Sequence, residues 1–526
     1  MDHVEELPPS DVRLVIGASS LGTIFEWYDF FIYGTLAPIV GKVFFPASSG
    51  VAQLLLTLAT FAVGFGVRPL GAVLFGYLGD RLGRKYTFLV TIALMGLATA
   101  GLGFVPPAAQ IGVAAPIILL CLRALQGLAL GGEYGGAAIY VAEHARHDRR
   151  GFYTSFIQGS VAGGFILSLA VVLATQAVLG KEAWEAWGWR FPFVFSLVLL
   201  AVSLWMRLKL SESPVFKAIK EAGETARNPL KETFTYPGNG RRLFVALFGI
   251  AAGLTVIWYT AMFQVLYFFQ NAMKLEPTIA QILVGIGAGA GLIFFVFFGW
   301  LSDRVGRKAP IVVGYALTLI LLFPIFTVMG HAANPNLATA SARAPVVVGG
   351  KDCSYSPFAK VQATECGKAL DMLSKRGVPY SINRSLVGVI IGEERMSAGR
   401  YPTEAELDAS LKMAGYNLEK VRPSGGNIVI ILLGVLGLSA LSGATYGPVA
   451  ALLSELFPPR IRYSSMSIPY HIGTGYFGGF LPFVSQYIVA KTGNPYAGLW
   501  YTWAVTAMAL VVTLAFLRKG DLSHLD

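Results

Sequence analysis

The stretch GYLGDRLGRK at residues 76–85 recurs as GWLSDRVGRK at residues 299–308, with seven of the ten positions identical. The two copies lie 223 residues apart, and each follows the second of six apolar runs. The sequence therefore predicts two parallel six-helix halves joined by the basic segment 211–241. In proteins built this way, a binding site lies between the repeats near the middle of the membrane.

The composition is that of a protein that crosses a membrane many times. Of the 526 residues, 55% are hydrophobic and 13% are charged, and the mean hydropathy is +0.60. A soluble protein carries about 25% charged residues, so intrinsic disorder, a soluble enzyme and a disulfide-stabilised scaffold are excluded. The fold class expected is all-α integral membrane. The apolar runs, each long enough to cross a bilayer, predict twelve spans: 14–41, 51–79, 86–105, 114–142, 152–178, 190–209, 243–272, 278–302, 309–330, 427–455, 463–490 and 496–517.

The distribution of Lys and Arg predicts the orientation. With the N-terminus in the cytoplasm, the inside segments carry 22 of these residues and the short outside loops carry 5. Positive residues concentrate on the cytoplasmic side of membrane proteins. This bias explains the net charge of +11 without a nucleic-acid partner. The acidic N-terminus lacks signal-peptide features, so we expect a multi-pass protein of a bacterial inner membrane with both termini in the cytoplasm.

Residues 331–425 interrupt the second half. A weaker echo relates residues 143–155 to 455–467 at an offset of 312, which is 89 more than the first repeat. The extra length predicts an extracytoplasmic α/β insertion between helices 9 and 10. The chain then divides into an N-terminal bundle (1–210), a linker (211–241), helices 7–9 (242–330), the insertion (331–425), and helices 10–12 with the tail (426–526).

Inside the insertion, VVVGG and LVGVIIG predict strands, and residues 359–376 predict an amphipathic helix. Thr403 and Glu406 predict a capping box that opens a helix ending near Met413. Cys353 and Cys366 are expected to form a disulfide in an oxidising compartment. Cys121 lies in an apolar run and is expected in the core. The role of the insertion is left open between a lid, a partner platform and a passive addition.

The repeated motif resembles the signature loop of the major facilitator superfamily. FEWYDFFIYG (25–34), GVRPLGAVLFGYLGDRLGRK (66–85) and RALQGLALGGEYGGA (123–137) are similar, within it, to the metabolite:proton symporters, which include proline/betaine, α-ketoglutarate, citrate and shikimate permeases. The resemblance covers nearly the whole chain outside 331–425. It implies that the motif latches the cytoplasmic side when the transporter faces outward, whereas the alternative is a topology signal only. The expected gating residues are Asp80, Arg81, Arg84, Arg149, Arg150, Asp303 and Arg307.

Ionisable groups inside spans are costly and mark function. Glu26 and Asp29 share one face of the first span, and their repulsion in a low dielectric favours a bound proton. We therefore expect them to couple protons, and which of the two carries the proton is open. The alternative is a structural pairing with Arg68 or Arg123. The resemblance assigns Arg123 to proton coupling. Glu133 lies in the same span and is also expected to take part in proton coupling.

Arg68 is the candidate ligand for an anionic substrate, since arginine binds carboxylates through two bonds. His471 either binds substrate or protons or is a hydrogen-bonded structural residue. The usual position of the seventh span in the superfamily implies that this span forms the second wall of the substrate cavity. The remaining substrate-binding candidates are Gln158, Tyr259, Gln264 and Tyr267. The glycines around Glu133 are read as a close helix-packing surface.

The predicted function is proton-coupled import of a small organic acid by alternating access. A zwitterionic osmolyte such as betaine or proline is the alternative substrate, and a receptor or partner-binding membrane protein is the alternative class. No G-x-x-x-x-G-K-[S/T] loop is present, and no catalytic set suggests an enzyme. The expected partners are the substrate, protons and the lipid bilayer. No cofactor or metal is expected, and a monomer is the default because nothing in the sequence indicates an oligomer.

Overall fold

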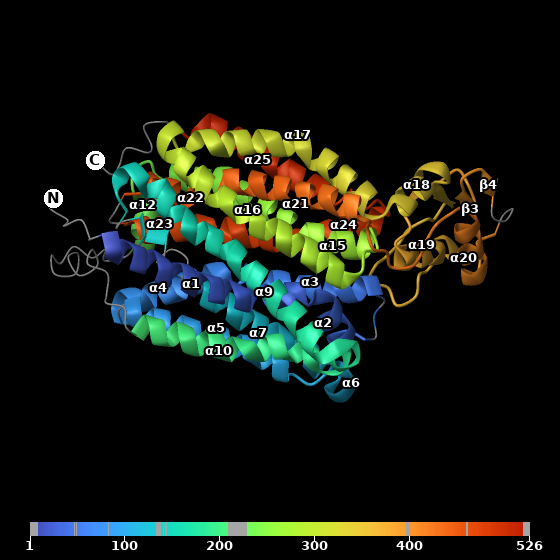
Figure 1. The fold of residues 1–526 in the computed structure, drawn as a ribbon, viewed down its shortest axis with the longest axis horizontal. Helices are drawn as coiled ribbons and strands as arrows, with labels where there is room; N and C mark the ends of the chain where they lie inside the picture. The colour runs from blue at the N-terminus through green and yellow to red at the C-terminus, as the bar shows by residue number, and fades with distance from the viewer. Residues whose placement is uncertain are drawn as a thin grey trace.

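The computed structural model consists of two helical bundles and a small α/β unit (Figure 1). It describes residues 9–46, 48, 50–82, 84–132, 138–139, 141–142, 145–208, 229–395, 400–458 and 461–518. Side chains are not described for residues 9–15, 18, 76–82, 84–88, 147, 207, 229 and 394–395. Much of the predicted linker, residues 211–228, lies outside the described residues.

The described part of the first bundle contains nine α-helices. They are α1 (Pro9–Thr35), α2 (Ala37–Phe44), α3 (Gly50–Gly66), α4 (Arg68–Leu82), α5 (Arg84–Phe104), α6 (Ala108–Ile111), α7 (Ala114–Gly131), α9 (Arg150–Ala186) and α10 (Phe191–Leu208), with 3₁₀ turns η1 (His147–Arg149) and η2 (Gly188–Arg190).

The second bundle contains α-helices and four π-helical stretches. They are α12 (Pro229–Thr235), α13 (Asn239–Phe244), η3 (Val245–Ala251), α14 (Ala252–Tyr259), η4 (Thr260–Gln264), α15 (Val265–Tyr267), η5 (Phe268–Ala272), α16 (Pro277–Val305), α17 (Lys308–Ala333), α21 (Gly425–Tyr446), α22 (Val449–Leu456), α23 (Arg462–Ile472), η7 (Gly473–Gly479), α24 (Leu481–Thr492) and α25 (Leu499–Phe516).

The two bundles lie side by side with their helices roughly parallel to the long axis of the molecule (Figure 1). Helix α1 begins and α25 ends at one end, here called the terminal end, and the α/β unit lies at the other, here called the insertion end (Figure 1). Helices occupy the twelve predicted spans, and nine helical stretches of the described chain are long and apolar enough to cross a membrane. The all-helical membrane fold is therefore observed, and the count of twelve crossings stays a prediction.

The predicted span 51–79 is interrupted in the middle. Helix α3 ends at Gly66, Val67 is a turn, and α4 begins at Arg68. Pro69 lies in the first turn of α4, where its missing N–H costs no helical hydrogen bond. The break places the Arg68 side chain between the two bundles, where it lines a cavity described below.

Glycines let α7 pack against α3 and α4 with backbones in contact. A Cβ at Gly127 would overlap the carbonyl oxygen of Gly64, and one at Gly131 would overlap that of Arg68. A Cβ at Gly132 would lie 2.7 Å from Cβ of Phe75. The packing role expected for the glycines around residue 133 is therefore found at Gly131 and Gly132.

Gly127→Ala is expected to destabilise the first bundle. Its methyl group must push α7 away from α3, and overpacking of this kind costs about 1–3 kcal/mol. The midpoint of thermal unfolding in detergent should fall by several degrees. Gly289→Ala on α16 is the matched control, since a Cβ there meets nothing within 4 Å. Equal midpoints for the two variants would contradict this account of the α3–α7 contact.

The α/β unit carries a four-stranded sheet in the order β2-β1-β3-β4. Strand β1 pairs parallel with β2 and antiparallel with β3, and β3 pairs antiparallel with β4. The elements are α18 (Pro335–Arg343), β1 (Val346–Gly349), α19 (Glu365–Arg376), β2 (Tyr380–Asn383), β3 (Gly388–Ile391), β4 (Glu394–Arg395) and α20 (Glu404–Met413).

Several predictions for this unit can be compared with the structure. The two predicted strands correspond to β1 and β3, and the Thr403–Glu406 capping box is confirmed at the start of α20. The predicted helix 359–376 starts later, because Thr364 caps the amide of Gly367. Cys353 and Cys366 are joined as a disulfide, with Cα atoms 5.1 Å apart. The core placement expected for Cys121 is wrong, because this residue of α7 is exposed on the outer surface of the bundle.

The insertion is held to the second bundle by hydrogen bonds from a loop and from the end of a helix. Val421 N donates to the carbonyl of Lys274 (2.9 Å), and Glu276 N donates to the carbonyl of Val421 (3.1 Å). Lys491 Nζ donates to the carbonyl of Tyr355 (2.7 Å). The loop after η5 and the last turn of α24 thus hold the unit, which lines the same cavity as residues of both bundles.

Candidate transport site

A small cavity lies between the two bundles near their centre. Its volume is about 10 Å³, which is room for about one water molecule. Arg68 is its one charged lining residue. Most of the other lining side chains are aromatic or hydroxylated, and the full lining comprises Trp27, Arg68, Val161, Leu254, Thr255, Trp258, Tyr259, Tyr446, Tyr470 and Thr474.

Arg68 is fully buried (0% exposed) among aromatic rings. Its guanidinium carbon lies 4.9 Å from the ring centres of both Trp27 and Phe65. A cation over aromatic faces is stabilised when it is removed from water. The rings therefore hold a positive charge at the interface of the bundles, where a carboxylate would find a partner.

Arg123 lies deeper in the first bundle, also at 0% exposure. Its Nη1 donates to Gln126 Oε1 (2.6 Å) and to the carbonyl of Phe30 (3.4 Å), and its guanidinium carbon is 4.5 Å from the centre of the Tyr33 ring. Among the described residues no carboxylate forms an ion pair with it. The Phe30 ring contacts both arginines, so the two buried charges are adjacent but separated.

Glu26 and Asp29 lie on α1 and are each 5% exposed. The main-chain carbonyl of Asp29 accepts from Gln126 Nε2 (3.3 Å), which in turn binds Thr99 Oγ1 (2.6 Å). Through Gln126, the main chain at Asp29 and the Arg123 side chain therefore belong to one buried polar network of the first bundle.

An aromatic layer closes the path from the insertion end to the central cavity. The rings of Phe31 and Trp258 stack at 5.0 Å, and those of Phe61 and Phe263 lie 5.7 Å apart, so both contacts join the two bundles. Tyr267 Oη donates to the carbonyl of Gly34 (2.8 Å), which adds a hydrogen bond across the same interface. Opening this layer requires the two bundles to separate locally.

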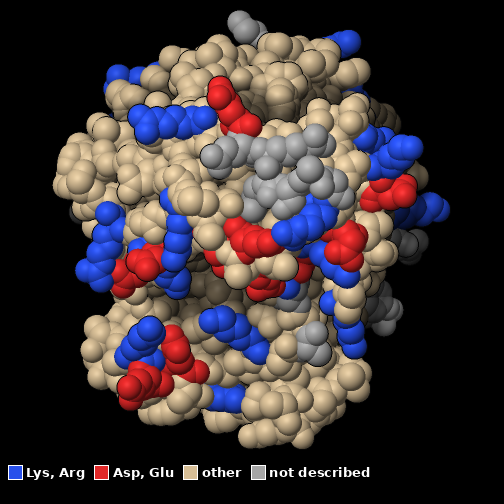
Figure 2. Space-filling view, turned by 90° about the vertical axis from the view of Figure 1, so that its right-hand side faces the viewer, with Lys and Arg blue, Asp and Glu red and all other residues tan. Residues whose placement is uncertain are grey.

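A large vestibule lies on the insertion side of this layer. Its volume is about 1290 Å³, and it is lined by both bundles and by the insertion. Figure 2 shows this end of the molecule hollowed, with charged residues around the opening. Gln486 Nε2 donates to Gln264 Oε1 (3.1 Å) on its wall. The lining contains two glutamates, Glu185 and Glu276, and five lysines: Lys42, Lys181, Lys274, Lys375 and Lys420.

The terminal end of the interface is closed by a polar latch. Asp303 at the end of α16 accepts from the amides of Gly151 and Phe152 at the start of α9, both at 2.8 Å. A carboxylate at a helix N-terminus is stabilised by the free amides and the helix dipole. Here the carboxylate and the helix come from different bundles, so the contact holds the bundles together.

Arg307 and Glu455 extend this latch. Arg307 donates to Asp303 and to Glu455, with Nη2–Oε1 at 2.9 Å. Arg150 of the first bundle lies 3.6 Å from the same Glu455 oxygen. Burial lowers the pKa of Arg307, but hydrogen bonds and charges from Glu455 and Asp303 outweigh it and raise this pKa, so the residue stays charged.

The structure brings together some of the predicted site residues and separates others. Arg68 and Tyr259 line the central cavity, Gln264 lines the vestibule, and Tyr267 bridges the bundles between them. Gln158 and His471 are buried but line neither cavity.

The predicted gating residues are also divided. Arg150, Asp303 and Arg307 meet in the latch, whereas Arg149 is exposed beside Asp148 (3.9 Å). Glu133 and the side chains of Asp80, Arg81 and Arg84 lie outside the described residues.

Sequence reasoning missed several residues of these sites. Trp258, Tyr446 and Tyr470 line the central cavity, but aromatic residues in an apolar run carry no distinguishing pattern. Trp27 also lines this cavity and lies against Arg68. Glu455 had a usable signal, because the weak repeat pairs it with Glu143 after spans 10 and 4.

Two helical bundles that meet around a buried arginine, open at one end and latched at the other, define a membrane transporter of the two-repeat class. The chain belongs to the Major Facilitator Superfamily, whose family model matches residues 19–349. The partially occluded, inward-open structure of the xylose transporter XylE from E. coli shares this fold, with a TM-score of 0.61 at 16% identity, over 97% of this chain and 98% of that one.

Curated relatives place the chain among metabolite transporters. The inner membrane metabolite transport protein YhjE of Escherichia coli is 29% identical over 100% of this chain and 98% of its own length. The shikimate transporter of E. coli is 38% identical over 60% of this chain and 72% of its own length. The proline/betaine transporter of Salmonella typhimurium is 35% identical over 60% and 64%. The chain is thus a multi-pass metabolite transporter related to the metabolite:proton symporters, and it is not an enzyme.

Proposed function

We propose that this protein imports a small organic acid together with a proton by alternating access. The observation that carries the proposal is the path of positive charge from the vestibule to the centre. Lysines outnumber glutamates five to two along the vestibule, and beyond the aromatic layer lies the guanidinium of Arg68. Such a path attracts anions and supplies a bidentate partner for a carboxylate.

The proposal includes an orientation in a bacterial inner membrane, with all twelve predicted spans crossing it. The terminal end is placed in the cytoplasm, because the short loops and termini there hold most of the lysines and arginines. The insertion then lies outside the cytoplasm, where a disulfide such as Cys353–Cys366 persists. With this orientation, the vestibule faces outward and the latch faces the cytoplasm.

Proton coupling is assigned to Glu26 and Asp29, with Arg123 beside them. Both acids are buried three residues apart on one helix. Two carboxylates close together in a low dielectric resist being ionised at the same time, so one of them tends to hold a proton. We assign this proton as the one that moves with the substrate. Glu133 stays a prediction from the sequence.

A zwitterionic osmolyte is the second candidate substrate, favoured by the aromatic lining of the central cavity. Trp27, Trp258 and Tyr259 surround a space beside Arg68. Aromatic faces bind quaternary ammonium groups, and the arginine would bind the carboxylate of the same molecule. A binding role without transport is a third candidate.

Uptake into proteoliposomes separates these candidates. We expect an inward proton gradient to drive accumulation of one member of a labelled panel of α-ketoglutarate, citrate, shikimate, betaine and proline. Accumulation of betaine or proline alone would replace the organic-acid proposal with the osmolyte. Equilibration without accumulation would remove the proton-coupling role, and absence of any transport would favour a receptor.

At least one of the two variants Glu26→Gln and Asp29→Asn is expected to lose gradient-driven accumulation of substrate. Exchange of substrate across the membrane should persist in that variant. Removal of the proton carrier uncouples the gradient but leaves Arg68 in place. Glu182→Gln, an exposed residue of α9, is the matched control and should accumulate substrate normally. Full accumulation by both buried variants would reject the assignment.

A further inference from the structure

Two lysines meet at the mouth of the vestibule, one from the second bundle and one from the insertion. Lys274 follows η5, and Lys420 precedes Val421, whose amide donates to the carbonyl of Lys274 (2.9 Å). Burial first, and then the charge of Lys420, lower the pKa of Lys274. The fold therefore brings two like charges near each other, and their repulsion disfavours the charged form of Lys274.

The backbone at Lys274 is held in an unusual conformation. Lys274 has φ +57°, the one positive φ of a non-glycine residue in the described chain. Gly377, the left-handed C-cap of α19, lets the Lys274 side chain lie against the insertion, because a Cβ there would lie 2.7 Å from Lys274 Nζ. A non-glycine residue with a positive φ raises the conformational free energy by about 1 kcal/mol or more. The contacts around Lys274 therefore hold it in this conformation.

Nearby carboxylates are engaged elsewhere. Glu276 binds Arg422 (2.6 Å), and Asp371 binds Lys375 (2.7 Å). Among the described residues no carboxylate forms an ion pair with Lys274 or Lys420. The positive charge of this pair is thus left for a ligand or for solvent.

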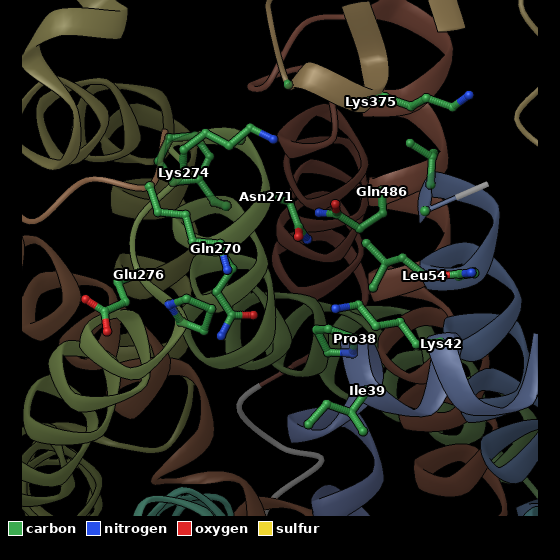
Figure 3. Close-up of a pocket in the computed structure, with 18 of the residues that line it drawn as sticks. Pro38, Ile39, Lys42, Leu54, Gln270, Asn271, Lys274, Glu276, Lys375 and Gln486 are labelled. Atoms are coloured by element: carbon green, nitrogen blue, oxygen red, sulfur yellow. The ribbon is translucent and has the colours of Figure 1, made fainter. Parts of the chain in front are cut away.

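Amide groups without partners face the same space. Asn271 Nδ2, Gln270 Oε1 and Gln281 Oε1 are buried atoms that no hydrogen bond satisfies within the described structure, and Gln281 is only 4% exposed. All three residues line the vestibule. In Figure 3, Asn271 points into the cavity below Lys274, toward Gln486. Buried polar atoms without partners are uncommon and indicate a missing ligand or water. Of these three atoms, Asn271 Nδ2 is the donor that a carboxylate would accept from, whereas the two glutamine oxygens need a donor such as water.

We propose that Lys274, Lys420 and Asn271 form an entry site that binds the carboxylate of an anionic substrate before the aromatic layer opens. The proposal rests on the proposed function for the class of substrate. Two ammonium groups and an amide donor match the oxygens of a carboxylate. The insertion supplies Lys420 and supports Lys274, so the role of this added unit is to complete the entry site.

The entry site lies on the vestibule side of the aromatic layer and is distinct from Arg68. A site there raises the local concentration of anions and their rate of entry, which depends on ionic strength. It does not take part in the crossing itself. Its loss should raise KM and leave the maximal rate unchanged.

The direct test is protection of lysines from acetylation in the purified full-length protein. Saturating citrate is expected to slow modification of Lys274 and Lys420 by an N-hydroxysuccinimide ester several-fold, as measured by mass spectrometry. Lys412, exposed near the end of α20 and away from the vestibule lining, is the control and should react at one rate throughout. Equal rates with and without citrate at all three lysines would overturn the proposal.

Liposome composition separates a substrate carboxylate from a lipid headgroup. Protection by citrate should be the same in vesicles of phosphatidylcholine alone and in vesicles with phosphatidylglycerol. If phosphatidylglycerol protects the lysines and citrate does not, the site binds lipid and the proposal fails.

The transport test uses Lys274→Gln/Lys420→Gln against Lys412→Gln. With the carboxylate that the wild type accumulates, the double variant should raise KM roughly tenfold at low salt, with an unchanged maximal rate and a weaker dependence on salt. An unchanged KM would overturn the proposal. If the wild type transports no carboxylate, the proposed function fails, while citrate protection still decides whether the anion site exists.

Discussion

Replacing Arg68 with lysine is expected to lower kcat/KM for uptake roughly 100-fold. A hydrogen bond to a charged group contributes about 1.5–3 kcal/mol, and each 1.4 kcal/mol corresponds to a tenfold change. Lysine keeps the charge but loses the planar group that lies between the rings of Trp27 and Phe65 and that can bind a carboxylate through two bonds. Initial uptake rates across a range of substrate concentrations measure the effect.

Arg304→Lys is the matched control for this variant. Arg304 also lies over an aromatic ring, with its guanidinium carbon 4.0 Å from the centre of Trp300, but it is exposed and far from both cavities. It should transport at the rate of the wild type. If Arg68→Lys also transports normally, with both proteins equally stable, the assignment of Arg68 as the substrate ligand is wrong.

Asp303→Asn is expected to shift the protein away from the outward-open state. The asparagine keeps the shape of the side chain but loses the charge that binds the amides of Gly151 and Phe152 and the guanidinium of Arg307. Loss of about 1.5–3 kcal/mol of charged hydrogen bonding would change the ratio of outward to inward states roughly 10- to 100-fold. The latch is formed only when the terminal end is closed, so its loss favours the inward state.

Labelling of a vestibule cysteine measures this shift. In a Cys121→Ser background, Leu54→Cys places a thiol on the vestibule wall (Figure 3). In the proposed orientation, a membrane-impermeant maleimide should reach this thiol from outside. Asp303→Asn should slow labelling, whereas Asp148→Asn, an exposed acid that pairs with Arg146 (3.2 Å), should not. Equal labelling rates in all three backgrounds would show that the latch does not hold the outward state.

Much of the fold could be predicted because the membrane imposes a simple rule. Spans must be long, apolar and helical, since no water is present to satisfy the backbone. The rule locates helices but not their irregularities. Pro69 is a sequence signal for the break at Val67, but the π-helical stretches η3, η4 and η5 lie within a continuous apolar run that carries no such signal.

The site could be predicted only in part, for a related reason. Charges in apolar spans are conspicuous, so Arg68 and Arg123 could be singled out, and the repeat pointed to Asp303 and Arg307. The partners of these charges depend on contacts between distant segments. No sequence pattern showed that Asp303 caps a helix 152 residues earlier or that Lys274 meets Lys420.

The positions that form the latch differ in how well they tolerate mutation. Asp303 is held by two main-chain amides, which every residue except proline provides, so the first bundle can change its side chains at position 152 without losing the donor. Position 151 lacks this freedom, because a Cβ there would overlap Arg307 Nη1 of the latch and lie 2.5 Å from the main-chain oxygen of Gly299 on α16. The second bundle has no such freedom, since a single carboxylate accepts both bonds. Random substitutions that impair closure of this end should therefore accumulate at Asp303 and Gly151 rather than at Phe152.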